Sequence, residues 1–392
     1  MRIAQVAPLI ESVPPPLYGG TERVVSWLTE ELVAQGHEVT LFASGDSQTR
    51  ARLVPGCSKA LRLHPTFTEV AIPHLLMYEK LARMAREFDL VHFHSDWAGF
   101  TFSRRLSVPS VFTMHGRMDL PDLPPLLREY GEVPLVSISN SQRHPLEWAN
   151  WAGTVHHGLP GDLYRYGQGK GGYLAFCGRV SAEKRLDLAI RIAQTAGMEL
   201  LIAAKVDKPD YEHFDRVIKP MLNVHGVHFI GEIGDHQKTD FFGNAAALLF
   251  PIDWPEPFGL VMIEAMACGT PVIAYPRGSV PEIIDHGVTG FIVESVDEAV
   301  EAIGRLSSFD RRRCRERFEE RFTARRMARD YLEVYRRLAG RQSLARTASF
   351  GAGAWSVPGL QGGHGGHAGR DATARGNWSA GHSWGRSVAW TR

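Results

Sequence analysis

The sequence predicts an α/β protein with two consecutive domains, each built on a doubly wound parallel sheet. Short β-branched runs alternate with helical patterns from residue 1 to about residue 156, which is typical of parallel α/β architecture. A glycine-rich stretch without periodicity then interrupts this pattern at residues 157–172, and a second alternation follows it. With 392 residues, the chain is long enough for two hydrophobic cores.

The first alternation starts with a strand at residues 3–7 and a proline-rich loop that ends at Gly19-Gly20. A helix is expected over residues 21–35, ahead of Gly36, because its apolar residues recur at helical spacing: Val24, Val25, Leu28, Leu32 and Val33. Further strands are predicted at 38–43, 90–94, 110–115 and 133–139.

The second alternation starts after the glycines of the linker. Strands are predicted at 173–178, 199–204, 227–230, 247–251, 271–274 and 290–293. Helices are predicted at 183–196, 238–246 and 259–267. We place the domain boundaries at 1–160 and 161–320.

The last eighty residues differ from both domains. Residues 311–340 form an arginine-rich helical pattern with an apolar stripe, which suits packing on a core and is also compatible with peripheral membrane contact. Residues 341–392 are rich in Gly, Ser, Ala, His and Trp and poor in aliphatic residues, so we expect this tail to be disordered.

Composition excludes several classes of function. The net charge of +1 gives no reason to expect a nucleic-acid partner. The four cysteines (57, 177, 268 and 314) are scattered without metal-site spacing, which indicates reduced thiols in the cytoplasm. The N-terminus does not match a signal peptide, and no apolar run approaches the ~20 residues that span a bilayer. A cytoplasmic protein is therefore expected.

The segment from Glu256 to Glu264 contains the most informative residues. Glu264 is the one charge in an apolar helical run, so it needs either a core arginine as partner or a pair of ligand hydroxyls such as those of a ribose. Glu256 lies in the loop before that helix, between two prolines. The amides of Phe258, Gly259 and Leu260 are expected to be unpaired donors at the start of the helix, suited to an anion or a sugar oxygen.

Other candidate ligand-binding residues follow predicted strands. Gly19 and Gly20 join the first strand to the first helix, where missing Cβ atoms allow a phosphate to approach the backbone. This pair lacks the Gly-x-Gly-x-x-Gly pattern of dinucleotide-binding sites. Arg179, Lys184 and Lys205 follow strands of the second domain and could neutralise a diphosphate without a metal, although solvated charges would give the same pattern.

Histidines follow two strands of the first domain. His115 ends a strand, at the edge where open α/β sheets bind ligands. His92, His94 and Asp96 are compatible with a metal site, but packing at the strand end is the favoured interpretation. No Asp-x-Asp occurs, so the usual carboxylate pair for a divalent ion is missing and no metal is expected.

The chain resembles family 4 of the retaining glycosyltransferases in motifs that occur in order over about residues 1–340. These are Gly19-Gly-Thr-Glu-Arg-Val24, Thr113-Met-His-Gly116, Gly178-Arg-Val-Ser-Ala-Glu-Lys184, Glu256-Pro-Phe-Gly-Leu260 with Glu264-Ala-Met-Ala-Cys-Gly-Thr-Pro-Val-Ile-Ala274, Gly278-Ser-Val-Pro-Glu-Ile-Ile284 and Gly287-Val-Thr-Gly-Phe291. The resemblance implies the GT-B fold, with the donor bound mainly by the second domain and the acceptor by the first. Residues 321–340 would form the family's final helix, which crosses back onto the first domain.

The resemblance also implies roles for the candidate residues. Glu264 would hold the ribose, and Glu256 with the amides of residues 258–260 would position the sugar and phosphate. Arg179 and Lys184 would stabilise the leaving diphosphate, while Gly20 would complete the phosphate cradle. His115 would contact the sugar near the reacting carbon.

These roles predict a retaining, metal-independent hexosyltransferase that uses a nucleotide-sugar donor, with a UDP-sugar favoured and GDP-mannose as the second choice. The acceptor is a carbohydrate, a lipid or a small molecule, and Arg117, Asp119 and Arg143 are the candidate residues on its side. A nucleotide-sugar epimerase, an NAD-dependent oxidoreductase and a non-catalytic sensor are the alternatives.

Overall fold

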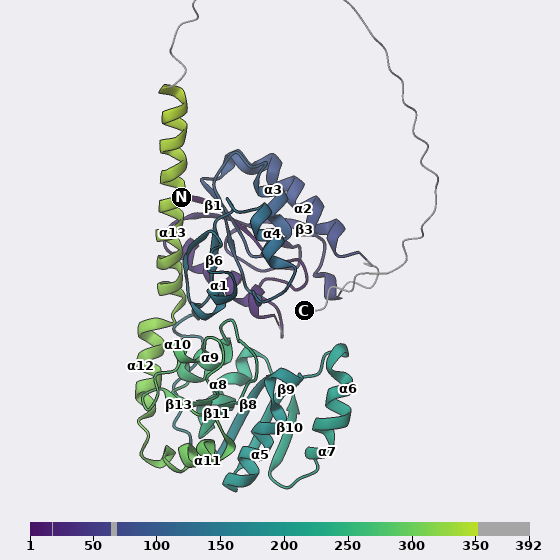
Figure 1. Cartoon of the computed structure of the whole chain (residues 1–392), viewed down its shortest axis with the longest axis vertical. Coiled ribbons are helices and arrows are strands. Elements are labelled where there is room, and N and C mark those ends of the chain that lie inside the picture. The colour runs from purple at the N-terminus through teal and green to yellow at the C-terminus, as the bar shows by residue number, and fades with distance from the viewer. Residues whose placement is uncertain (18, 64–68, 352–392) are drawn as a thin grey trace, which may run out of the picture. The chain divides into compact units, whose positions relative to one another are not determined.

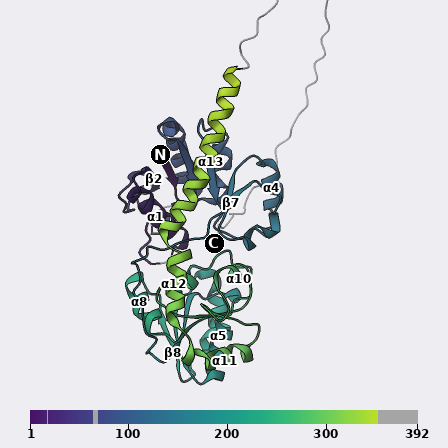
Figure 2. The same ribbon diagram turned by 90° about the vertical axis from the view of Figure 1, so that its left-hand side faces the viewer.

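The computed structural model describes residues 1–17, 19–63 and 69–351. Figure 1 and Figure 2 show the chain in two views. Of the predicted tail, residues 352–392 lie outside the described residues, whereas residues 341–351 belong to the last helix.

The first sheet has seven parallel strands in the order β3-β2-β1-β4-β5-β6-β7. The strands are β1 (Arg2–Val6), β2 (Glu38–Ser44), β3 (Arg52–Cys57), β4 (Leu90–Phe93), β5 (Ser110–Thr113), β6 (Leu135–Ser137) and β7 (Trp151–Thr154). The five predicted strands are all present, and the two strands that were not predicted, β3 and β7, form the edges of this sheet.

The helices of this half follow the strands along the chain. They are α1 (Gly20–Ala34), α2 (Ala71–Met84), α3 (Phe100–Ser103) and α4 (Leu123–Glu129). Helix α1 follows the predicted pattern closely: Val24, Val25, Leu28 and Leu32 are buried, and Gly36 follows with a φ of +83°. A glycine takes this left-handed conformation without strain, so the chain can turn into β2.

The second sheet has six parallel strands in the order β10-β9-β8-β11-β12-β13. They are β8 (Tyr173–Arg179), β9 (Glu199–Lys205), β10 (Val227–Gly231), β11 (Ala247–Phe250), β12 (Val272–Ala274) and β13 (Gly290–Ile292). In both sheets the strand order reverses beside the first strand, between β1 and β4 and between β8 and β11. Such reversal points leave a crevice at the carboxyl ends of the strands, where ligands bind in this architecture.

The main helices of the second half are α5 (Leu186–Ala196), α8 (Asp235–Asn244), α9 (Leu260–Ala267), α10 (Val280–Ile283) and α11 (Val296–Gly304). Two short helices, α6 (Tyr211–His213) and α7 (Lys219–Met221), lie between β9 and β10. The helix predicted from residue 183 begins instead as a 3-10 turn at Ala182–Lys184, and Arg185 has a φ of +54° before α5 starts. This turn separates Lys184 from the rigid body of α5.

The arginine-rich pattern at 311–340 forms two helices, α12 (Arg311–Arg321) and α13 (Ala324–Gly351). They are interrupted where Leu159 pairs with the backbone on both sides of Thr323: Leu159 N donates to Phe322 O at 2.8 Å, and Ala324 N donates to Leu159 O at 2.6 Å. Helix α13 contacts the first sheet through Tyr331 and Tyr335, which bond residues of β4, β5 and β1. No helix among the described residues is long and apolar enough to cross a membrane.

Candidate functional site

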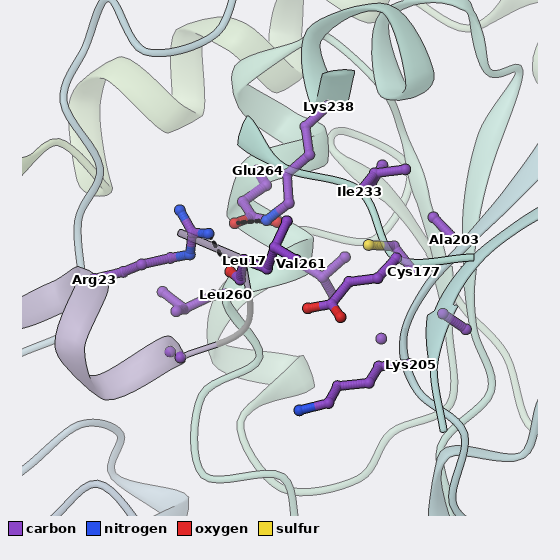
Figure 3. A pocket seen from close by; sticks show the side chains of 15 residues that line it. Leu17, Arg23, Cys177, Ala203, Lys205, Ile233, Lys238, Leu260, Val261 and Glu264 are labelled. Atoms are coloured by element: carbon purple, nitrogen blue, oxygen red, sulfur yellow. Dashed lines mark hydrogen bonds and ion pairs between the residues drawn. The ribbon is translucent and has the colours of Figure 1, made fainter. Parts of the chain in front are cut away.

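A cavity of about 170 Å³ lies where the carboxyl ends of β8 and β9 meet the loop after β1 (Figure 3). Five of the predicted donor-site residues line it: Gly19, Gly20, Lys205, Leu260 and Glu264. Side chains that the sequence did not single out complete the lining, among them Arg23, Cys177, Glu232 and Lys238. The cavity therefore combines glycine backbone, charged groups and apolar walls.

Glu264 meets a lysine in this cavity. Lys238 Nζ, on α8, donates to Glu264 Oε1 at 2.7 Å, and both side chains are almost completely buried (Figure 3). Burial opposes the charged form of Lys238, but Glu264, Cys177 and Asp235 together outweigh it and raise the pKa of Lys238. The interpretation of Glu264 as one half of an ion pair is thus correct, with lysine in place of the expected arginine. Because the pair lines an open cavity, the carboxylate is also placed to meet a ligand.

A second, partly buried ion pair extends the network. Arg23 of α1 contacts the Asp235 carboxylate at the start of α8, and Tyr164 Oη donates to the same carboxylate at 2.8 Å. Lys238 Nζ lies 3.6 Å from Asp235 as well, so the charges of Arg23, Asp235, Lys238 and Glu264 alternate in sign. Each charge is compensated by its neighbours, which offsets the free-energy cost of removing these groups from water.

Glu256 is held by two donors. Lys184 Nζ contacts Glu256 Oε2, and Trp254 Nε1 donates to the same oxygen at 2.9 Å. Lys184 also lies 4.9 Å from the ring centroid of Trp254 and 5.6 Å from that of Phe250. The predicted carboxylate and the predicted cation, which come from separate segments, therefore form an ion pair beside two aromatic rings.

The loop before α9 is fixed by close backbone packing. Gly278 has a φ of +57°, and a Cβ atom there would lie 2.3 Å from the backbone nitrogen of Glu256. Ser279 N donates to Glu256 O at 2.9 Å, and Ser279 Oγ donates to Phe258 O at 2.8 Å. Gly259 precedes α9 with a φ of +78°. Only glycine suits these two left-handed positions, so the sequence itself preorganises the loop.

The remaining predicted cations are already paired with carboxylates. Arg179, at the end of β8, lies 2.9 Å from Glu183 and 3.4 Å from Asp210. Lys205, at the end of β9, lies 3.0 Å from Asp207. All three predicted cations are thus at strand ends or in the adjoining turn, but each would share its charge between a bound anion and a resident carboxylate.

His115 follows β5 and lies among other histidines. Its ring stacks on that of His157 at 5.3 Å between centroids, and His157 contacts the Phe258 ring at 4.8 Å. The backbone N of His115 donates to Asp96 Oδ1 at 2.9 Å. His115 is therefore connected through ring contacts to the loop that carries Glu256.

His92 and His94 are packed in the core, as the favoured interpretation predicted. Both are fully buried and hydrogen-bonded through both ring nitrogens, to Tyr335, Thr113, His115 and Gln5. Across residues 1–17, 19–63 and 69–351, no group of three or more His, Cys, Asp or Glu side chains is arranged to hold a metal ion.

The three predicted acceptor-side residues lie apart from the cavity lining. Arg117 Nε donates to Asp119 Oδ1 at 2.6 Å, and both residues are exposed. Arg143 lies with its guanidinium 5.5 Å from the Trp151 ring centroid and donates to Thr154 Oγ1 at 3.3 Å. The structure does not bring these three residues into one cluster with the donor-site residues.

Several side chains of the site were missed from the sequence. Arg23 belongs to the quoted Gly-Gly-Thr-Glu-Arg motif and lies on the first turn of α1, so its position beside the glycines was a usable signal. Lys238 is the first residue of a predicted helix, where a lysine normally faces solvent. Its role depends on the spatial approach of α8 to α9, which local sequence does not show.

Two family models match the chain. The model of the glycosyl transferases group 1 matches residues 167–322, and the model of Glycosyltransferase Family 4 matches residues 18–158. D-inositol 3-phosphate glycosyltransferase from Streptomyces scabiei is 26% identical, with 72% of this chain and 77% of that protein covered.

Solved structures share the fold. Sucrose-phosphate synthase from Thermosynechococcus elongatus superimposes with a TM-score of 0.71 at 19% identity, covering 87% of this chain and 100% of that one. The Anabaena protein HepE, in complex with UDP, gives a TM-score of 0.67 at 17% identity, covering 86% and 100% of the two chains. The predicted architecture of two parallel-sheet domains of the GT-B type is therefore confirmed.

Proposed function

The chain belongs to the group 1 and family 4 glycosyltransferases, and on this basis we propose that it moves a hexosyl group from a nucleotide sugar to a hydroxyl acceptor. The observation that carries the proposal is the cavity in which the Gly19-Gly20 backbone, Lys205 and the Glu264–Lys238 pair meet. These are the groups that a diphosphate and a ribose require: open backbone, positive charge and a carboxylate acceptor.

In this proposal Glu264 accepts hydrogen bonds from two ribose hydroxyls, and the diphosphate lies against Gly19, Gly20 and Lys205. A UDP-sugar is the favoured donor, supported by the bound UDP in the HepE structure, and GDP-mannose is the second choice. Glu256 and the amides of Phe258, Gly259 and Leu260 hold the sugar. Lys184 and Trp254 fix the Glu256 carboxylate, so it is held in place for a sugar hydroxyl.

The transfer exchanges one bond for another at the anomeric carbon. The bond from that carbon to the diphosphate oxygen breaks, and its electron pair leaves with the nucleoside diphosphate. The acceptor hydroxyl oxygen forms the new bond, and its proton passes to the departing diphosphate. Lys184 and Arg179 stabilise the charge that grows on the leaving diphosphate, which is electrostatic catalysis by fixed cations. We propose that the reaction proceeds without a metal and with retention of configuration.

A thermal-shift panel tests the donor assignment. Ligands that bind only the folded state raise its stability, by about 2.7 kcal/mol at a concentration of 100 Kd. We expect UDP and UDP-sugars to raise the melting temperature, with GDP second and ADP and NAD without effect. Stabilisation by NAD alone would indicate an oxidoreductase and would overturn the proposal.

The products then separate the remaining alternatives. Transfer or slow hydrolysis releases free nucleoside diphosphate, whereas an epimerase converts one sugar nucleotide into another and a sensor leaves the donor intact. NMR of the newly released or transferred sugar gives its anomeric configuration. An inverted product would contradict retention without affecting the transferase assignment.

A further inference from the structure

A continuous chain of hydrogen bonds connects His115 to the C-terminal helix α13. His115 Nε2 lies 3.0 Å from His94 Nδ1, and His94 Nε2 lies 2.7 Å from Gln5 Oε1 on β1. Gln5 Nε2 then donates to Tyr335 Oη at 3.1 Å. Four residues that are far apart in the sequence therefore form one path from the candidate site to α13.

The path continues past Tyr335 through the sheet. Tyr335 Oη lies 2.7 Å from His92 Nδ1, and His92 Nε2 lies 2.7 Å from Thr113 Oγ1. Thr113 Oγ1 lies 2.8 Å from Tyr331 Oη, one turn before Tyr335 on α13. Apart from His115, every member of the chain is completely buried, so water cannot replace the contacts among these other members.

One side chain gives the whole path a direction. The carbonyl oxygen of the Gln5 amide faces His94 and can only accept, so His94 Nε2 must carry a proton. A neutral His94 then has an unprotonated Nδ1, which can only accept from His115 Nε2. On the other side, the Gln5 NH₂ group donates to Tyr335, which leaves the Tyr335 proton for His92. The donor and acceptor roles are thus consistent from one end to the other.

These donor and acceptor roles require that both buried histidines, His92 and His94, are neutral. Burial lowers the pKa of His94 to about 3 and lowers that of His92 well below its usual value. Neither ring is therefore protonated twice at physiological pH, and each has one donor and one acceptor nitrogen.

We propose that Gln5 and His94 are positioning residues that hold His115 with its proton on Nε2, and that Tyr335 of α13 fixes the orientation of the Gln5 amide. Held in this way, His115 would contact the transferred sugar in one fixed orientation. This last step rests on the proposed function, whereas the protonation pattern of the three residues does not.

Nitrogen-15 NMR of the full-length protein, labelled in histidine, tests the pattern directly. We expect His94 to show a protonated Nε2 and an unprotonated Nδ1, and His115 to show a protonated Nε2. A proton on Nδ1 of His94, or an unprotonated Nε2 on His115, would mean that the Gln5 amide is turned around, and it would overturn the inference. The result is the same whether or not the protein transfers sugars, so it is independent of the proposed function.

Kinetics of two His94 variants test the effect on catalysis. In His94→Gln, the amide oxygen can accept from His115 and the amide nitrogen can donate to Gln5, as the neutral imidazole does. We expect His94→Leu to lower kcat about tenfold or more and His94→Gln to keep it within about threefold of wild type. Binding of UDP should be unchanged in both, because UDP lacks the transferred hexosyl group that His115 would contact. Equal losses of kcat in the two variants would contradict a positioning role.

Variants of two tyrosines of α13 test the same inference if the His94 variants do not fold. Tyr335→Phe removes the anchor of Gln5, while Tyr331→Phe removes an equally buried hydroxyl at the far end of the path. We expect the first to reduce the proportion of His94 protonated on Nε2 and the second to leave it unchanged. The same spectrum in both variants would show that α13 has no influence on this tautomer. If the wild type showed the expected protonation pattern but did not turn over any donor, only the proposed function would be contradicted.

Discussion

Lys184 illustrates how a single charge gains its effect from its surroundings. Its ammonium contacts the Glu256 carboxylate and lies 4.9 Å from the Trp254 ring, so little water screens it. Because charge grows on the leaving diphosphate, this cation should act more strongly in the transition state than in the bound ground state. We expect Lys184→Ala to lower kcat by about 100-fold or more, with a smaller change in the Kd for UDP. Steady-state kinetics and calorimetry measure the two effects.

Lys219 gives a matched control for this variant. It is an exposed lysine that pairs with Asp215 at 2.7 Å on the short helix α7. Lys219→Ala should leave kcat unchanged. If Lys184→Ala kept full turnover at saturating donor, the leaving-group role of Lys184 would be wrong.

Glu264 has two functions that a pair of variants can separate. Glu264→Gln leaves the buried Lys238 without its carboxylate and removes the charged acceptor for the ribose. We expect the Kd for UDP to rise about tenfold or more and the free energy of unfolding to fall by about 1–3 kcal/mol. Adding Lys238→Met removes the uncompensated charge, so it should restore stability and not UDP binding. Recovery of both would show that Glu264 is only structural.

For single residues, the sequence indicated which side chains need a charged partner better than it indicated which residues those partners are. Glu264 could be predicted to need a partner because a lone carboxylate in an apolar helix is costly. That the partner is Lys238 could not, since the contact depends on how α8 lies against α9. The same holds for Glu183, Asp207 and Asp210, which pair with the predicted cations from neighbouring turns.

Among the elements, helix α12 is held in place by arginines. From the sequence alone, these arginines would be expected to face solvent. The Arg311 guanidinium donates to Ala245 O at 2.9 Å and to Thr270 Oγ1 at 2.8 Å. Arg315 donates to Tyr164 O and Ala267 O, each at 2.8 Å. These two arginines donate hydrogen bonds to carbonyl groups of the second domain. Part of the positive charge that suggested membrane contact therefore lies against the protein itself.

A substitution in α12 tests this structural role. Arg311→Met should lower the free energy of unfolding by about 2 kcal/mol or more, because several buried carbonyl groups lose their donor. The exposed Arg313, whose nearest carboxylate is Glu316 at 3.8 Å, is the control, and Arg313→Met should change stability by no more than about 0.5 kcal/mol. Chemical denaturation measures both, and equal effects would contradict the distinction.

Element prediction succeeded for strands and helices with clear periodicity and failed where periodicity was weak. Strand β3 contains Pro55 and Gly56, and β7 reads Trp-Ala-Gly-Thr, so neither gives a β-branched run. Both are edge strands, which tolerate such residues because only one side must pair. The interruption between α12 and α13 has no local signal either, since Leu159 imposes it from a distant loop.

For the molecule as a whole, Glu282 connects residues of the two halves of the chain. From α10 its carboxylate accepts from the backbone amides of Asn140, at 2.8 Å, and Ser141, at 2.7 Å, and lies 3.1 Å from His156 Nε2. Burial alone would raise the pKa of Glu282, but these donors outweigh it and lower the pKa below the ordinary value of 4.5.

A lowered pKa in the folded state defines how this contact depends on pH. Its stabilising effect is complete above pH 4.5 and is lost as the pH falls through the lower folded-state pKa. We expect Glu282→Gln to be less stable than wild type by about 1–3 kcal/mol at pH 7, and the difference to shrink progressively below pH 4.5. Urea titrations over this range measure it. The exposed Glu301 is the control, and Glu301→Gln should follow the wild type at every pH.

The two-sheet plan could be predicted because each half repeats the same alternation, and the motifs along the chain predict a donor side that stays a prediction. The acceptor could not be predicted. Arg117 and Asp119 pair with each other on the surface, and Arg143 packs near Trp151, so no arrangement of these residues specifies an acceptor.

Release of nucleoside diphosphate tests the proposed reaction most directly. Full-length protein is incubated with UDP-glucose, UDP-galactose and GDP-mannose in the presence of EDTA, and free nucleoside diphosphate is followed with time. We predict that at least one UDP-sugar is turned over by the wild type, that EDTA does not change the rate, and that Lys184→Ala is slower by about 100-fold. No release from any donor, or equal rates for wild type and Lys184→Ala, would contradict the proposal.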